Sequence, residues 1–500
     1  MFEGVKRILK GRKQHGANTP VFNERMFAAA QHNRLVDWPL SYMRVNGDLF
    51  LQYTTIVLRA RDLAMNNENV IGLLRNLQRN VIGVTGFTLQ SKTSDTALRS
   101  ELENAWREYC SRVGGWCTLD EHTSARDLDI LVLRSLVIDG ECFIRRTFDP
   151  SSKFGWRFEV IDSLQIDPMY TVENTGGKNR IYMGVELDER GREVAYYYRP
   201  TIDEAYYTGQ RERLDAANVI HLYRKEFPAQ IRGISMLAGA VLDLRQLDDY
   251  RTAELVHARI GSSVMGVWEW NQNDSDDVLE HDTNDPGQFV REIRPGIFPI
   301  APRGYTAKFL QGSQPNNQFG VFVKSIMRSI ANSIGISYNK AAGDYESVNY
   351  SSLREAALED RETFCELQKF LIENWKTLQY RDFVHALLIT GRIPATGDIS
   401  NITRHQFFGR RFAWVDPQKE ITAKKQEFAL MLTDPISELE ARGEDPEEVI
   451  ARFDAWKKLL AEKGMLEFWI GAFDKLPDTV AEIAEEPENQ PQPEITNGEP

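Results

Sequence analysis

The sequence predicts an α+β fold in which a mixed lobe of helices and strands precedes a series of long helices. Three observations lead to this prediction. Apolar residues recur at approximate helical spacing over 52–80 and 97–111. Between 130 and 225 the chain changes to short runs rich in β-branched and aromatic residues, which are typical of strands. After Gly233 the helical periodicity returns and continues, with one polar interruption, to about residue 463.

The chain has the size and composition of a folded protein with several domains. Its 500 residues allow about three domains, or one elongated chain with several lobes, at roughly 100–200 residues per domain. Apolar residues make up 42% and charged residues 27%, which excludes wholesale disorder and fibrous repeats. No stretch approaches the ~18 uninterrupted apolar residues of a membrane span. The four cysteines are too sparse for a disulfide scaffold, so we expect reduced thiols in a cytoplasmic setting.

The formal net charge of −13 limits how the chain could meet nucleic acid. Proteins that grip DNA or RNA over their whole surface are normally basic, because their affinity comes from neutralised phosphates. We therefore exclude that class. Residues 1–24 form a basic arm, for which a flexible, solvated segment is favoured over a nucleic-acid contact. Residues 471–500 form an acidic tail, which has seven acids, five prolines and no Lys or Arg from Leu476 onward and is predicted to be disordered.

The first lobe is predicted to cover about 25–230. Its first helical pattern is interrupted near NNEN (66–69), and VIGVTGFTLQ (81–90) then has the pattern of a strand punctuated by glycines. From residue 130 the chain is expected to be mostly extended, with strands at ECFIRRTF, WRFEVID, RIYMGVELD, EVAYYYR and VIHLYR. His221, in the last of these strands, is interpreted as a packed, hydrogen-bonded residue and not as a catalytic one.

Two helices separated by a polar insert are predicted after Gly233. The first, 235–261, would span about 40 Å at 1.5 Å per residue. An acid-rich insert follows at 268–287. The second helix, 318–335, has four apolar residues at i, i+4 spacing and polar residues on the opposite side. The apolar residues are Phe322, Ile326, Ile330 and Ile334, and the polar ones are Lys324, Arg328 and Asn332.

A loop and a third long helix come next. The loop covers 336–350, and the S-x-x-E spacing of Ser352 and Glu355 predicts the start of a helix that runs to about residue 389. Further helices are expected at about 418–432 and 445–463. Two stiff helices around a small insert, and a loop that leads into a third, form an unusual order of elements.

No arrangement of residues predicts a catalytic site. The sequence GGK at 176–178 lacks the first glycine of a phosphate-binding P-loop and is interpreted as a turn, and no G-x-S-x-G or H-E-x-x-H sequence occurs. The acids between 274 and 285 lack the glycine and the last glutamate of a calcium loop. No lysine stands at nuclease-like spacing from the two acid pairs that could bind metals, so we expect no enzyme activity, no metal and no cofactor. These pairs are Asp139 with Glu141 and Asp162 with Asp167.

Four blocks of the sequence together resemble one known family. They are ARDLAMNNENVIGLLRNLQRNVIGVTGFTLQ (60–90), VIHLYRKEFPAQIRGISMLAGAVLDLRQLDDYRTAEL (219–255), GISYNKAAGDYESVNYSSLREAALEDR (335–361) and WVDPQKE (414–420). In order and separation they resemble the lambda-type portal proteins of tailed bacteriophages, over roughly residues 25–465. The most specific parts are the Q-x-R-G of Gln230, Arg232 and Gly233, and the GDYESVNYSS block.

The resemblance implies a structural, non-enzymatic subunit of a twelve-fold ring at the unique vertex of the capsid. Double-stranded DNA would pass through this ring during packaging and ejection without being read for sequence. The implied partners are other copies of the chain, the terminase large subunit, a major capsid or scaffold protein and a head–tail adaptor protein, with no membrane. The implied location is the virion, and the host cytoplasm during assembly.

The resemblance also implies a division of the chain into the parts of the portal fold. A mixed α/β wing would surround two stem helices, and a small α/β clip would lie between those helices. A tunnel loop would follow the second stem helix, and a helical crown would end the chain. The implied ranges are 1–24 for the basic arm, 25–233 for the wing, 234–263 for the first stem helix, 264–316 for the clip, 317–335 for the second stem helix, 336–350 for the tunnel loop, 351–416 for a long kinked helix and return to the wing, 417–470 for the crown and 471–500 for the acidic tail.

Polar residues of the second stem helix and the loop are the candidates for facing the DNA channel. Lys324 and Arg328 could equally pair with acids of a neighbouring subunit, such as Asp248, Asp249 or Glu254. The loop tyrosines could equally pack against neighbouring subunits. The candidates are Lys324, Arg328, Tyr338, Asn339, Lys340, Tyr345, Asn349 and Tyr350, and the structural motif positions are Gln230, Arg232, Gly233, Trp414, Asp416 and Pro417. For Arg232 we expect a structural ion pair, and for Gly233 a role in backbone geometry.

Two other functional classes compete with the portal interpretation. One is a DNA-processing enzyme of the packaging machinery, such as a terminase-like nuclease or ATPase. The missing P-loop and the missing cluster of metal ligands in the sequence speak against it. The other is a monomeric adaptor in the cytoplasm, which a mass measurement would separate from a ring.

Overall fold

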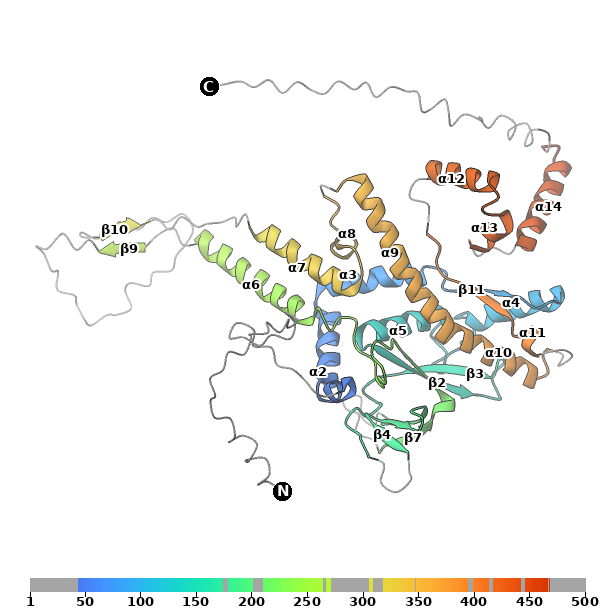
Figure 1. The fold of residues 1–500 in the computed structure, drawn as a ribbon, viewed down its shortest axis with the longest axis horizontal. Helices are drawn as coiled ribbons and strands as arrows, with labels where there is room; N and C mark the ends of the chain where they lie inside the picture. Colours follow the sequence, from blue (N-terminus) through green and yellow to red (C-terminus); the bar gives the residue numbers. More distant parts are fainter. Residues whose placement is uncertain are drawn as a thin grey trace, which may run out of the picture.

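The fold is α+β: an inner body of helices and antiparallel sheets from which two long helices project (Figure 1). The projecting pair, α6 (Val241–Ser263) and α7 (Phe319–Ile334), lies side by side, and the last helices form a group beyond the body. The computed structural model describes residues 44–173, 179–200, 210–263, 267–270, 305–308, 318–346, 348–393, 399–412, 417–441, 446–465 and 467.

The first helical region is divided at the predicted interruption. Helix α2 (Val45–Asn66) ends before Asn67, whose side chain accepts hydrogen bonds from two backbone N–H groups and so caps α3 (Glu68–Leu77). A π-helical turn, η2 (Gln78–Ile82), then continues the helix to Gly83.

The strand predicted at 81–90 is therefore wrong over its first residues. Val81 and Ile82 are fully buried, and the Val81 carbonyl accepts a hydrogen bond from Gln368 (3.0 Å). Only Thr88–Ser91 is extended, as β1, and it pairs antiparallel with β11 (His405–Phe408). A short apolar run fits a buried helical turn as well as a strand, so periodicity alone could not separate them.

The extended region also begins later than expected, because residues 130–138 belong to a helix. After α4 (Thr96–Cys110), Ser124 caps α5 (Ala125–Ile138) by accepting a hydrogen bond from the N–H of Asp127 (3.1 Å). Most of α5 is buried, so its apolar residues surround the helix and do not form the one-sided stripe by which a surface helix is recognised.

All five predicted strand patterns contain strands, which lie in two antiparallel sheets, but RIYMGVELD is divided into two paired strands, and one further strand, at 212–215, was not predicted. In the first sheet β2 lies between β3 and β8, and in the second the strands follow chain order. The first sheet contains β2 (Glu141–Phe148), β3 (Trp156–Ile161) and β8 (Val219–Tyr223), and the second contains β4 (Arg180–Tyr182), β5 (Val185–Leu187), β6 (Glu193–Tyr198) and β7 (Glu212–Asp215); the short helix η3 (Ala216–Asn218) connects β7 to β8.

Helix α6 begins six residues later than predicted. Residues 236–240 form turns, in which the Ser235 hydroxyl accepts a hydrogen bond from the N–H of Leu237 (3.2 Å). The 23 residues of α6 therefore span about 34 Å and not 40 Å. Tyr250 of α6 stacks on Phe319 of α7, with ring centroids 5.5 Å apart, and so holds the pair together.

Between these two helices, β9 (Val267–Trp270) pairs antiparallel with β10 (Tyr305–Lys308). Most of the predicted clip, 264–316, and the acid-rich insert within it lie outside the described residues.

The long helix predicted after the loop is present, although it begins and bends differently. It consists of α9 (Tyr350–Leu371), a π-helical turn η4 (Ile372–Lys376) and α10 (Thr377–Ile389). Asn349 is the residue before its first turn, so Ser352 lies inside the helix and the predicted capping box is wrong. Within η4, Trp375 and Lys376 both turn inward and contact the buried carboxylate of Asp129 in α5 (2.7 and 3.2 Å).

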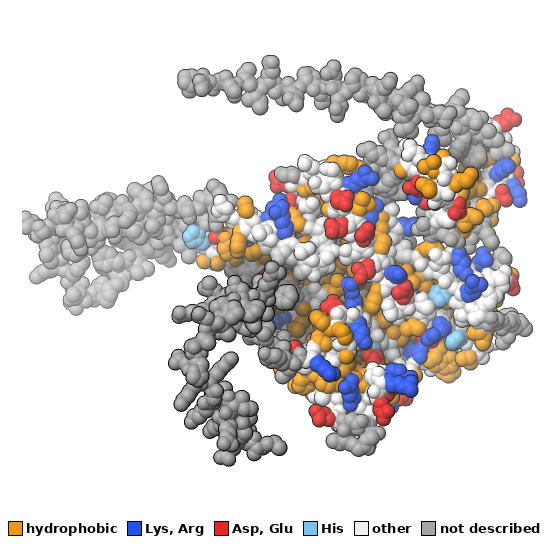
Figure 2. Space-filling model, in the orientation of Figure 1, with side chains coloured by type: hydrophobic (Ala, Val, Ile, Leu, Met, Phe, Trp, Pro, Cys, Tyr) orange, Lys and Arg blue, Asp and Glu red, His pale blue; other side chains and the backbone are white. Residues whose placement is uncertain are grey.

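The main hydrophobic core links α3, α5, β2 and the long helix with the bases of α6 and α7. Short helix α11 (Ile399–Ile402) precedes β11. The last group contains α12 (Pro417–Ala429), α13 (Pro435–Ala441) and α14 (Pro446–Glu462), and it exposes many large apolar side chains (Figure 2). The basic arm 1–24 and the acidic tail 471–500 lie outside the described residues. Within the described part of the chain, no helix is both long enough and apolar enough to cross a membrane.

Candidate nucleic-acid interface

The structure brings the eight predicted channel residues together on α7, on the loop after it and at the start of α9. Helix α7 ends at Gly335, which adopts a left-handed conformation (φ 78°). The N–H of Ile336 then donates to the Ala331 carbonyl (3.0 Å) in a Schellman-type arrangement, and Ile336 is buried. The chain thus reverses at a fixed point, and the short helix α8 (Tyr338–Ala342) is positioned against α7.

Asp344 holds the loop to α7. Its carboxylate accepts a hydrogen bond from the Tyr338 hydroxyl (2.8 Å) and pairs with the Lys324 ammonium (3.3 Å). A hydrogen bond from the N–H of Glu346, with those from Tyr338 and Lys324, lowers the pKa of Asp344 below its usual value. Burial and the bond to Asp344 raise the pKa of Tyr338 to about 12. The charge of Lys324 is therefore neutralised by Asp344 of the same chain, and this ion pair holds the loop to α7.

Arg328 and Lys340 differ from Lys324 because neither has a carboxylate partner among the described residues. Arg328 is exposed, and its guanidinium lies 5.6 Å from the centre of the Tyr338 ring. Lys340 is half-buried in α8, and its carbonyl accepts a hydrogen bond from Asn76 of α3 (2.7 Å). Helix α7 and the braced loop therefore each present one positive charge that no carboxylate of the described residues neutralises.

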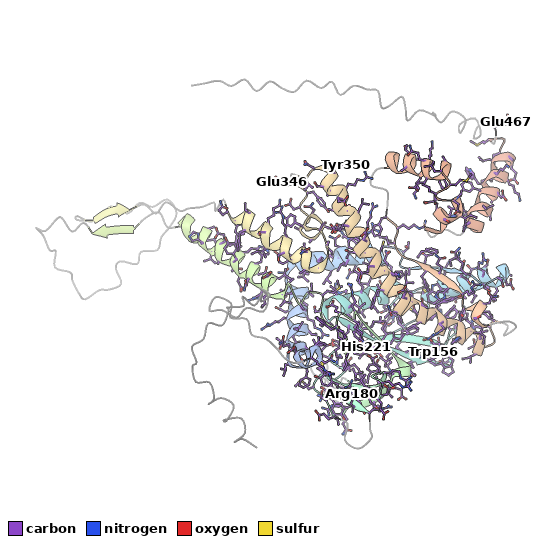
Figure 3. All side chains as sticks on the ribbon, viewed as in Figure 1. Trp156, Arg180, His221, Glu346, Tyr350 and Glu467 are labelled. Atoms are coloured by element: carbon purple, nitrogen blue, oxygen red, sulfur yellow. The ribbon has the colours of Figure 1, made fainter. Side chains whose placement is uncertain are left out.

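The remaining loop candidates are arranged around these charges. Tyr345 and Tyr350 are each 55% exposed, and Asn339 is half-buried. Asn349 is exposed and makes no side-chain capping bond to α9. Figure 3 shows Tyr350 and the neighbouring Glu346 at the end of α9 that lies farthest from the sheets. The two tyrosines and Asn349 are thus polar or amphipathic groups that solvent reaches.

Sequence reasoning missed the two residues that fix the loop to the long helix. Asp360 of α9 is buried and accepts two hydrogen bonds from Ser337, one from its N–H and one from its hydroxyl (both 2.7 Å). Thr363 donates to the Gly335 carbonyl (2.8 Å). A usable signal exists, because Asp360 stands four residues before Phe364 on the apolar stripe of α9, where a buried carboxylate needs a partner.

Two of the three acids considered as alternative partners for Lys324 and Arg328 are engaged elsewhere in the same chain. Asp248 accepts a hydrogen bond from Asn67 (2.7 Å), and Asp249 pairs with Arg245 (3.4 Å). Pairing between subunits stays a prediction.

The Q-x-R-G segment connects β8 to α6. Gln230 is buried; its side-chain oxygen accepts hydrogen bonds from the N–H groups of Glu226 and Phe227 (2.9 and 3.0 Å), and its amide donates to the Arg232 carbonyl (2.8 Å). A Cβ on Gly233 would lie 2.1 Å from the carbonyl oxygen of Gly140, so no side chain fits there.

Arg232 is fully buried (0% exposed) at the junction of sheet and helix. Its guanidinium pairs with Glu141 (2.6 Å) and donates to the Tyr53 hydroxyl (2.9 Å). It also donates to the carbonyls of Ser163 and Met183 (2.9 and 2.7 Å). Arg232 therefore ties α2 and β2 to the segment that leads into α6.

His221 lies on the other side of Glu141, and its side chain is also buried. It bridges Glu141 (3.0 Å) and Glu193 (3.1 Å). Burial alone would lower the pKa of His221, but the two carboxylates raise it above its usual value. Burial alone would raise the pKa of Glu141, but Arg232 and His221 lower it to about 2. This arrangement is an internal charge network.

The acids considered as metal ligands are also occupied. Arg61 of α2 binds both Asp139 (2.6 Å) and Asp162 (2.7 Å), and Arg211 binds Asp167 (2.7 Å). In the described part of the chain, no group of three or more His, Cys, Asp or Glu residues could hold a metal ion.

Of the WVDP positions, Trp414 and Asp416 lie outside the described residues, and Pro417 is the first residue of α12.

An α+β body with two projecting helices and a braced polar loop has the order of elements that the resemblance to portal subunits implied. The model of the family described as "Phage portal protein, lambda family" matches residues 31–368. The chain therefore belongs to the lambda family of phage portal proteins, and this assignment supports the portal interpretation and not the DNA-processing enzyme.

Three relatives are described as portal proteins or as a probable portal protein. The chain is 28% identical over 416 residues to a probable portal protein of Halomonas phage phiHAP-1, covering 80% of this chain and 79% of the relative. It is 21% identical over 479 residues to portal protein B of Escherichia phage lambda (84% and 86% covered). It is 20% identical over 453 residues to the portal protein of Escherichia phage N15 (79% and 82% covered).

Similar solved structures come from gene transfer agent particles. One is the neck of an empty particle computed with C6 symmetry, at a TM-score of 0.46 and 13% identity, covering 82% of this chain and 96% of that chain. Another is the neck of a native particle computed with C12 symmetry, at a TM-score of 0.44 and 12% identity (78% and 94% covered).

Proposed function

We propose that this portal protein assembles into a closed ring of twelve chains at one capsid vertex, and that double-stranded DNA passes through the ring during packaging and ejection. The observation that carries the proposal is the braced loop with Arg328 and Lys340 free of carboxylate partners among the described residues. Membership of the lambda portal family supports it.

The proposed lumen surface consists of α7, α8 and the loop to α9. Each phosphate that a wall neutralises releases counterions and strengthens binding, so a dense cationic wall would resist sliding. On this surface Arg328 and Lys340 have no carboxylate partner among the described residues, and two such cations in a chain of net charge −13 favour weak and transient contacts. Asn339, Tyr345, Asn349 and Tyr350 could touch the phosphates without reading the bases, which needs paired groove contacts.

Exposed apolar side chains support contacts between subunits. A ring that closes by rotation needs two complementary faces on each subunit, and large exposed apolar patches mark interaction sites. Helices α6 and α7 expose Leu242, Leu255, Val321 and Phe322, and the group α12–α14 exposes Met431, Leu432, Ile436, Phe453 and Trp456.

The remaining assignments follow the same proposal. Residues 25–233 would form the wing, 234–263 and 317–335 the stem helices, 264–316 the clip, 336–350 the tunnel loop, 351–416 the long helix and return, and 417–470 the crown. The terminase large subunit, a head–tail adaptor and a capsid or scaffold protein would dock on the ring in the virion or in the host cytoplasm during assembly. The subunit would make or break no bond, so ATP turnover by the purified chain would contradict the proposal.

Mass in solution tests the assembly. A ring of twelve chains has a mass of about 690 kDa, against 57.4 kDa for a single chain. Size-exclusion chromatography with light scattering separates these values, and electron microscopy of the large species should show a ring with a central hole. A species of 57.4 kDa at every concentration, with no ring in the images, would refute the proposal.

A charge reversal tests the channel surface. Lys340→Glu should leave the ring intact but reduce the yield of packaged DNA, because the loop would repel the passing phosphates. Lys225→Glu is the matched control, since Lys225 is exposed on the body and has no carboxylate partner in the part of the chain that the structure describes. Unchanged packaging by Lys340→Glu, or an equal loss in the control, would contradict a lumen role for the loop.

A further inference from the structure

An apolar groove lies at the point where the described chain begins. Its volume is about 670 Å³, and Arg44, the first described residue, forms part of its wall. Tyr182, Phe227 and Ile231 give the groove its apolar character. Phe227 is 47% exposed and is followed by the exposed Pro228, so this surface stands open among the described residues.

The floor of the groove is rigidly built. Asn46 donates to the Ala229 carbonyl (2.7 Å) and accepts from the N–H of Ile231 (3.1 Å). The Tyr182 hydroxyl donates to the Asn46 carbonyl (2.9 Å). Ala229 is held at φ 60°, a conformation that costs energy in a residue other than glycine. The surface is therefore preformed.

We propose that the groove binds the segment Trp38–Met43 of the same chain. This segment, WPLSYM, directly precedes Arg44, and all of its residues except Ser41 are apolar or aromatic. Because Arg44 forms part of the groove wall, the segment starts at the rim of the groove. Its six residues reach at most about 20 Å from that point. An apolar segment that starts at the rim of an apolar groove removes both surfaces from water when it folds back.

The charges at the rim agree with this occupant. Arg44 and Arg180 line the groove, and neither has a carboxylate partner within the described ranges. Figure 3 shows Arg180 at the lower edge of the body. Asp37 is the only acid between residues 26 and 43, and it stands directly before Trp38. With the segment in the groove, Asp37 lies within reach of this pair of cations.

The contact has a consequence for the projecting helices. The groove floor includes Ala229 and Ile231, which flank Gln230 in the segment that leads through Arg232 into α6. The bound segment therefore connects the basic N-terminal arm to the base of α6. This proposed contact lies within one chain, so it does not depend on the number of chains in the ring.

Hydrogen–deuterium exchange on the full-length chain tests the proposal. Backbone amides of 38–43 should exchange at least about tenfold more slowly than in an unfolded peptide. Phe227→Asp should abolish this protection, because it places a charge in the groove at a side chain already half exposed. Val84→Asp is the control, since Val84 is an exposed apolar residue (88%) that does not line the groove. Intrinsic exchange rates in the wild type, or protection that survives Phe227→Asp, would overturn the proposal.

Disulfide trapping separates the same chain from a neighbouring copy. Leu40→Cys with Pro228→Cys, in a Cys365→Ser background that removes the exposed native thiol, should give a disulfide within one chain. Peptide mass spectrometry identifies that disulfide, and the chain keeps its single-chain mobility on a non-reducing gel. Disulfides that join two chains would overturn occupancy by the same chain and assign the groove to a second copy.

Discussion

Replacing Arg232 with alanine should lower the free energy of unfolding by about 3–5 kcal/mol, the usual cost of breaking a buried ion pair from one side. Arg232 and Glu141 are both 0% exposed, so the remaining carboxylate cannot reach water. The substitution also removes the donor to the carbonyls of Ser163 and Met183, and each buried group left without a partner costs about 1–3 kcal/mol.

Urea unfolding followed by circular dichroism measures this loss. Arg232→Lys keeps the charge but cannot reproduce the planar set of donors, so it should recover only part of the stability. Arg192→Ala is the control; its side chain is 73% exposed and pairs with Asp188 at the surface, and no measurable change is expected. A loss below about 1 kcal/mol in Arg232→Ala would refute the reasoning.

The same variant has a pH signature. Glu141 has a folded-state pKa of about 2, below its ordinary value of 4.5. The stability that it contributes is therefore fully present above about pH 4.5 and is lost as the pH falls through about 2. Because Arg232 causes much of the lowering, Arg232→Ala should lose less stability over this acid range than the wild type does. An unchanged acid profile would show that the pair is not the cause.

Four further substitutions have expected outcomes that follow from the described structure. Gly233→Ala should destabilise the chain by about 3 kcal/mol or more, because the new Cβ would overlap with backbone atoms. Gly72→Ala lies in open space within α3 and should stabilise the chain by about 0.5–1 kcal/mol; the urea midpoints of the two variants measure both effects. The raised pKa of His221 gives stability that is fully present below pH 6.5 and is lost as the pH rises through the folded-state pKa. His221→Asn should therefore remove this loss, so that the urea midpoint changes less than in the wild type as the pH rises above 6.5. Asp360→Ala should release Ser337 and speed proteolysis of the loop about tenfold, while the global urea midpoint changes little; unchanged cleavage would show that Asp360 does not brace the loop.

The regular parts of this fold could be predicted from the sequence because their patterns are one-sided. Helix α7 has apolar residues at i, i+4 spacing and ends within a residue of its predicted limit. The strands at 141–148 and 156–161 are rich in β-branched and aromatic residues and are separated by a clear turn sequence. Helix α5 was missed over 130–138 because it is buried on most sides, which erases the helical stripe.

The sequence predicted which elements carry the candidate residues, but it did not predict the contacts of these residues. The spacing of α7 put Lys324 and Arg328 on one polar face, and nothing in that spacing distinguishes them. Asp344 makes the difference, because it neutralises Lys324 from twenty residues away, and Arg328 has no carboxylate partner among the described residues. The Arg232–Glu141 pair joins residues 91 positions apart, so only the folded chain reveals it.

At the π turn Ile372–Lys376, the structure restricts insertions and deletions more strictly than it restricts substitutions. One extra residue rotates the two halves of the long helix by about 100° relative to each other. Asp360 contacts Ser337 from one half, and Trp375 and Lys376 contact Asp129 from the turn itself. Deleting a single residue here would direct one set of contacts away from its partners with almost no change in composition. Evolution should therefore accept substitutions in this stretch more readily than insertions or deletions.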